Sequence, residues 1–126
     1  MIKNDWLSKQ IEMMSQALAV ILFGKDAAYN FAVEEDEAQG GLEMDDDVLL
    51  SFMLRRLMDE GKINEAENLL FESIEGSASE GKLQIALAFY GQLDKMSDSF
   101  LSEHSFSREE ILDGLSSVKE IYEQRQ

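Results

Sequence analysis

The chain contains no proline and no threonine, and these two absences restrict its fold more than any other feature of the sequence. Proline interrupts helix interiors, and strands favour β-branched residues. Valine, another β-branched residue, occurs only four times, whereas leucine occurs sixteen times and alanine ten times in 126 residues. Leucine and alanine are both strong helix formers. The composition therefore predicts an all-α fold.

The spacing of apolar residues predicts where the helices lie. A chain of this length suits one domain, so we expect residues 1–126 to form a single helical unit. Helical periodicity, bounded by cap residues or glycine, marks five segments: residues 4–23, 45–60, 64–75, 80–103 and 107–122. Short connections predict that neighbouring helices pack antiparallel. The expected fold has five or six helices, because the pattern leaves open whether residues 25–44 contain another.

An acidic stretch separates the first two of these segments. Residues 34–47 contain eight acids and no base, and two glycines interrupt any helix within them. We expect a mobile acidic loop over residues 34–47.

The overall charge argues against several classes of partner. The chain has 26 acids and 11 bases, a formal net charge of −15. Nucleic acids and anionic membranes attract basic surfaces, so we expect neither as a partner. The apolar run at residues 17–23 is shorter than the roughly 20 residues that span a bilayer. It also lacks the basic start of an export signal, so we expect a cytoplasmic location.

The first predicted helix is apolar on two faces. One stripe consists of Leu7, Ile11, Met14, Leu18, Ile21 and Leu22, and the second of Trp6, Met13, Ala17 and Val20. So wide an apolar surface predicts a helix that is covered on more than one side. We expect the few other helices to cover only one of the two faces. Trp6, Met13 and Val20, on the uncovered face, are therefore the candidate interface residues.

Local signals predict the ends and the inner faces of the remaining helices. Asn4 is expected to cap the first helix. Asn64 with Glu67, and Ser107 with Glu110, have the spacing of a capping box at the starts of two others. Residues 80–103 are expected to form one continuous helix. The helix over residues 45–60 is expected to bury Leu50, Met53, Leu54 and Leu57.

We found no pattern that indicates catalysis or a bound cofactor. Cysteine is absent and His104 is the sole histidine, so a catalytic triad or a zinc site lacks its partners. The acids show neither the spacing of a calcium loop nor a Glu-x-x-His pair. Gly40 and Gly41 are not followed by the Lys-Ser/Thr of a nucleotide loop. We therefore expect no enzyme activity, and no catalytic, cofactor-binding or metal site.

The segment from Leu50 to Ile74 resembles a tetratricopeptide-type helix hairpin. The resemblance rests on Gly61 at the turn, Ala66 where the helices cross, and Leu70 one turn later. It implies two closely packed antiparallel helices. The segment departs from that family at three positions, where leucine replaces an aromatic residue, glycine and tyrosine: Leu50, Leu54 and Leu57. No second copy of the hairpin follows at a fixed period.

The whole chain resembles an uncharacterised family of short, acidic, helical bacterial proteins. The resemblance lies in the opening Asn4-Asp5-Trp6, in residues 21–25, and in the hairpin turn over residues 61–66. This family also looks tetratricopeptide-like, and the resemblance does not indicate any particular activity.

These observations favour a non-catalytic protein-interaction module whose protein partner is unidentified. One alternative is a structural homodimer formed through the first helix. Another is a helical protein that binds a small ligand in a pocket between helices.

Overall fold

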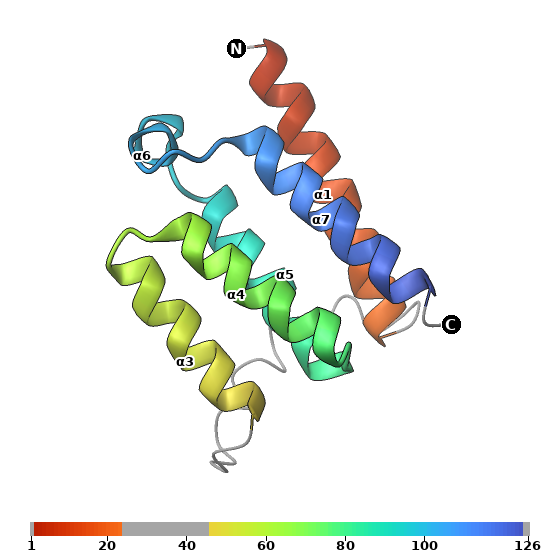
Figure 1. Ribbon diagram of the computed structural model, residues 1–126. Coiled ribbons are helices and arrows are strands. Elements are labelled where there is room, and N and C mark those ends of the chain that lie inside the picture. The colour runs from red at the N-terminus through yellow and green to blue at the C-terminus, as the bar shows by residue number, and fades with distance from the viewer. Residues whose placement is uncertain (1, 24–45, 125–126) are drawn as a thin grey trace.

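The computed structural model describes residues 2–23 and 46–124, and these parts of the chain form six α-helices (Figure 1). They are α1 (Ile2–Phe23), α3 (Asp46–Asp59), α4 (Ile63–Gly76), α5 (Glu80–Asp94), α6 (Asp98–Glu103) and α7 (Arg108–Gln124). The described residues contain no strand, so the expected all-α fold is confirmed. Asp46 and Asp47 begin α3, whereas the rest of the predicted acidic loop and the possible helix within residues 25–44 lie outside the described residues.

Helix α5 is the central element of the packing. It contacts α1 and α7, which also pack on each other, and it contacts the pair formed by α3 and α4. Figure 1 shows the consequence: α3 lies at one edge of the molecule and α1 at the opposite edge. The core between them consists of leucine, isoleucine, alanine and aromatic side chains, among them Leu18, Ala66, Leu83, Tyr90, Leu93, Ile111 and Leu115.

The first helix buries one of its two apolar stripes. Leu7, Ile11 and Leu18 are buried, and Met14, Ile21 and Leu22 pack against the core. The helix begins at Ile2, so the predicted cap at Asn4 is wrong, because the backbone is already helical at that position. Among the described helices, none combines the length and apolar content that crossing a bilayer requires.

The turn between α3 and α4 has the short geometry that the sequence predicts. Gly61 has φ +78°, a left-handed conformation that glycine adopts most easily, and the Lys62 N–H donates to the Leu57 carbonyl at 2.8 Å. The two helices lie side by side (Figure 1). Ala66, predicted where they cross, has no exposed surface.

The predicted capping box of α4 is wrong because its two side chains have tertiary partners. The N-cap residue is Lys62, whose side chain makes no capping hydrogen bond. Asn64 instead donates from Nδ2 to the Ser105 carbonyl at 3.1 Å. The Glu67 carboxylate accepts from the Tyr90 hydroxyl at 2.6 Å. Bonds to other parts of the fold therefore replace the local ones.

The predicted cap of α7 is confirmed at Ser107. Its Oγ accepts from the backbone N–H of Glu110 at 3.3 Å, and its hydroxyl donates to the Glu110 carboxylate at 3.2 Å. Phe106 and Ile111, on either side of this cap, are both buried.

The expectation of one helix over residues 80–103 is wrong. Helix α5 ends at Asp94, and the short helix α6 begins at Asp98. Ser97 is the physical reason, because its Oγ accepts from the Phe100 N–H at 3.0 Å and so starts a new helix. Because the apolar periodicity continues through the break, a prediction based on apolar stripes does not detect the break.

Candidate functional site

The outer face of α1 exposes three large apolar side chains in one line. Trp6 is 59% exposed, Met13 63% and Val20 42%. They lie seven residues apart, so they share one side of the helix and extend over about 21 Å of its length. We call these three residues the α1 face. The structure thus exposes the candidate interface residues that the sequence indicates, on the side of α1 turned away from its buried stripe.

A shallow, open hollow lies on the same side of α1. The described residues that line it are Met13, Gln16, Ala17 and Val20, with Glu12 at its edge. All five of these described residues belong to α1. The hollow therefore adjoins two residues of the α1 face, Met13 and Val20.

A second exposed apolar surface, on α3, is absent from the sequence prediction. Leu49 is 45% exposed, Phe52 59% and Met53 41%, and Val48 beside them is also exposed. Met53 was expected in the core and that expectation is wrong: Met58 is buried instead, with Leu50 and Leu54. Helix α3 lies at the edge of the fold, where its main contacts are with α4 and α5. None of the described helices therefore covers this part of its apolar surface.

Two basic residues, Arg56 of α3 and Lys62 of the turn that follows it, share one acidic partner. Arg56 approaches Glu60 at 3.6 Å, and Lys62 approaches the same carboxylate at 3.4 Å. All of these side chains are largely exposed, and exposed ion pairs contribute about 0–1 kcal/mol. They therefore mark a solvated edge.

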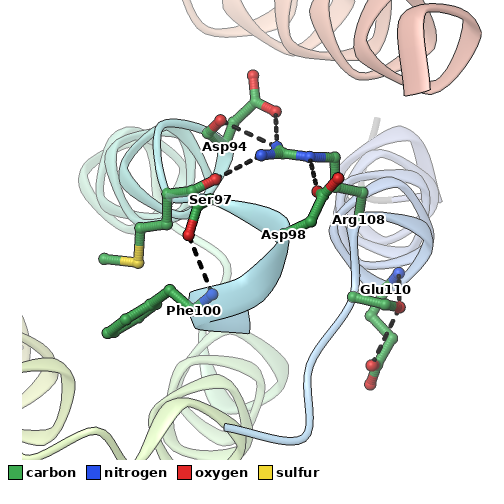
Figure 2. A network of polar contacts seen from close by, with 8 residues as sticks. Asp94, Ser97, Asp98, Phe100, Arg108 and Glu110 are labelled. Atoms are coloured by element: carbon green, nitrogen blue, oxygen red, sulfur yellow. Dashed lines mark hydrogen bonds and ion pairs between the residues drawn. The ribbon is translucent and has the colours of Figure 1, made fainter. Parts of the chain in front are cut away.

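The most connected polar cluster in the described residues surrounds Arg108, at the start of α7 (Figure 2). Its guanidinium donates to the carbonyl and to the carboxylate of Asp94, both at 2.9 Å, to Asp98 at 2.7 Å, and to the Met96 carbonyl. The side chain is 15% exposed. The cluster therefore holds the end of α5, the linker and the start of α6 to α7, and all three guanidinium nitrogens serve that role.

Glu67 and Tyr90 form the most buried polar pair. Burial raises the pKa of Glu67 from its ordinary value of 4.5, the hydrogen bond from Tyr90 opposes this, and the negative charges of Glu110 and Asp113 add to the rise. The pKa of Tyr90 is raised as well, first by burial and then by its bond to Glu67. The phenol also lies against Gly114 of α7, so the pair joins three helices. In the described part of the chain, no three acidic or histidine side chains meet in a way that could hold a metal ion.

His104 has a structural position at the end of α6. Its Nδ1 lies 2.8 Å from the Phe100 carbonyl, and its ring covers Gly61 in the α3–α4 turn. A hydrogen-bond donor is required opposite a carbonyl, so this contact assigns the proton to Nδ1. The histidine therefore helps to pack α6 against the turn.

The fold defines an all-helical protein with exposed apolar surfaces on two of its outer helices. The chain belongs to the family of unknown function DUF6483, which it matches over residues 1–123. No curated protein matches the chain, and no solved structure matches it.

Proposed function

We propose that the chain is a non-catalytic protein-interaction module that binds its partner through the α1 face. The observation that carries this proposal is the line of three exposed apolar side chains, Trp6, Met13 and Val20. Exposed apolar residues that are scattered singly are ordinary, whereas an aligned set of this size is typical of an interaction site. Tryptophan is also the residue type most enriched among the anchors of protein interfaces.

The roles of the polar clusters support the non-catalytic part of the proposal. Arg108 joins helix ends, Glu67 binds Tyr90, and His104 packs on a turn. Each of these groups has a structural task in the core or at a joint. The proposal includes the cytoplasmic location expected from the sequence.

The hairpin of α3 and α4 supports a tetratricopeptide-like character for the module. Gly61 has the left-handed backbone of a tight turn, and Ala66 is buried where the helices approach. In proteins of that type, helix pairs present surfaces to partner proteins.

Of the two alternatives, the homodimer has support from the structure. A small ligand normally binds in a concavity that encloses most of its surface. The hollow beside Met13 is open, so a protein surface suits it better. Dimerisation through α1 uses the same face as the proposed module and differs only in the partner.

Site-specific photocrosslinking in the native host tests the proposal. Met13 is replaced by a photoreactive phenylalanine analogue, and the matched control carries the analogue at the exposed Ser117 of α7. The proposal predicts covalent protein adducts at position 13 that are absent at position 117. Equal and weak labelling at the two positions would contradict it.

A further inference from the structure

Trp6 and the hollow on α1 have complementary shapes. Trp6 is the largest exposed apolar side chain in the described residues. Glu12 is one of the five described residues that line the hollow, and the other four are spaced i, i+3, i+4 and i+7: Met13, Gln16, Ala17 and Val20. Four residues with this spacing form the depression into which a side chain from a facing helix inserts. One helix thus carries both a projecting side chain and a receptor for one.

We infer that the partner of the α1 face is a second copy of this chain, bound antiparallel so that each Trp6 enters the hollow of the other copy. The inference rests on the proposed function, since it names the partner of that same face. A two-fold dimer requires one surface to be complementary to itself. A projection and a hollow on the same face meet that requirement.

Helix geometry fixes the register of this pair. The centre of the hollow lies between Gln16 and Ala17, about ten residues or 16 Å along the axis from Trp6. In an antiparallel pair both insertions form together when the two-fold axis passes between Ile11 and Glu12. Met13 of each copy then lies opposite Gln10 of the other.

Side-chain size favours the antiparallel arrangement over a parallel one. In a parallel pair, Trp6 would meet Trp6 at one end and Val20 would meet Val20 at the other, which makes the layers unequal and leaves both hollows unfilled. The antiparallel pair sets the largest side chain against Ala17, and large residues opposite small ones pack most evenly. The glutamate and glutamine beside the hollow, Glu12 and Gln16, offer acceptors for the indole N–H.

The charges on α1 both favour and oppose this register. Lys9 and Glu12 are exposed and lie on the same edge of the α1 face. In the antiparallel register Lys9 of one copy lies near Glu12 of the other, and the two Glu12 side chains approach each other beside the two-fold axis. The net charge of −15 on each copy opposes association, and added salt weakens that repulsion.

Disulfide trapping tests the register, because the chain has no cysteine of its own. Gln10→Cys and Met13→Cys variants, one of them enlarged by a tag, are mixed and oxidised. The antiparallel dimer predicts mainly the mixed product, in which position 10 of one variant is joined to position 13 of the other. Same-residue disulfides in both variants would indicate a parallel pair and overturn the inference. Ser51→Cys, on the exposed side of α3, measures the rate of random collision.

Sedimentation equilibrium of the full chain tests the partner itself. The inference predicts a dimer at tens of micromolar protein whose dissociation constant rises about tenfold or more in Trp6→Ala, because interface tryptophans are energetically dominant. A monomer under all salt conditions, with trapping no faster than in the Ser51→Cys control, would overturn the second copy as partner. The crosslinks at position 13 in the native host would then still decide the proposed function independently.

Discussion

At the scale of single residues, the negative charge of Glu67 opposes folding. Its pKa is raised by burial and by the charges of Glu110 and Asp113, so folding makes this carboxylate harder to ionise than it is in the unfolded chain. A raised pKa in the folded state adds to the free energy of unfolding. This contribution is complete below the ordinary pKa of 4.5 and is lost as the pH rises through the raised value. We predict that Glu67→Gln, which keeps an acceptor for Tyr90, raises the free energy of unfolding at pH 7 and flattens its decline above pH 4.5.

Urea denaturation at several pH values measures this effect. Glu72→Gln supplies the control, since Glu72 is an exposed residue of the same helix and the same change there removes one charge without relieving burial. We expect Glu67→Gln to raise the free energy of unfolding more than Glu72→Gln does. A loss of stability at pH 7 would show that the bond from Tyr90 to the carboxylate outweighs the cost of burying the charge.

Two helical glycines, Gly114 and Gly91, offer a matched pair of substitutions. A Cβ at Gly114 would meet the ring of Tyr90, with Cε1 at 2.8 Å, whereas a Cβ at Gly91 would meet nothing within 4 Å. We predict that Gly114→Ala destabilises the protein by about 1–3 kcal/mol through overpacking. Gly91→Ala should stabilise it by about 0.5–1 kcal/mol, because alanine loses less backbone entropy in a helix. Thermal denaturation of both variants checks the pair, and equal shifts would contradict the packing of Tyr90 on α7.

At the scale of elements, Arg108 connects three helices. Removing its guanidinium leaves the Asp94 carbonyl and carboxylate, the Met96 carbonyl and Asp98 without their shared donor. We predict that Arg108→Met lowers the free energy of unfolding by about 2–3 kcal/mol and speeds amide hydrogen exchange in α6 most of all. Arg55→Met, at an exposed position, should stay within about 0.5 kcal/mol of wild type. Unchanged exchange in α6 would mean that Arg108 does not anchor that helix.

The sequence predicts which helix residues are buried better than it predicts where helices begin and end. Apolar spacing correctly predicts that Leu50 and Leu54 are buried, because a helix must turn its apolar stripe toward the core. Caps are harder to predict, since Glu67 has the right spacing for a local bond yet binds Tyr90, 23 residues away. The break after Asp94 follows from the cap at Ser97, a hydrogen bond that apolar periodicity does not reveal.

At the scale of the whole molecule, the position of each helix decides which apolar residues stay exposed. The α1 face could be predicted, because α1 is apolar on two sides and a small domain covers one of them. The α3 surface could not, because the stripe rule assigns Met53 to the core without knowing that α3 lies at the edge of the fold. Two outer helices at opposite edges therefore present apolar surfaces, and the one on α1 adjoins an open hollow.

Tryptophan fluorescence tests the central claim most directly, because Trp6 is the one tryptophan of the chain and lies in the α1 face. An indole emits at shorter wavelength when it leaves water for an apolar contact. The account predicts that the emission maximum moves to shorter wavelength as protein concentration rises, and that added salt brings this shift to lower concentration. Emission typical of an exposed indole, constant from nanomolar to tens of micromolar protein and at every salt concentration, would contradict self-association through the α1 face.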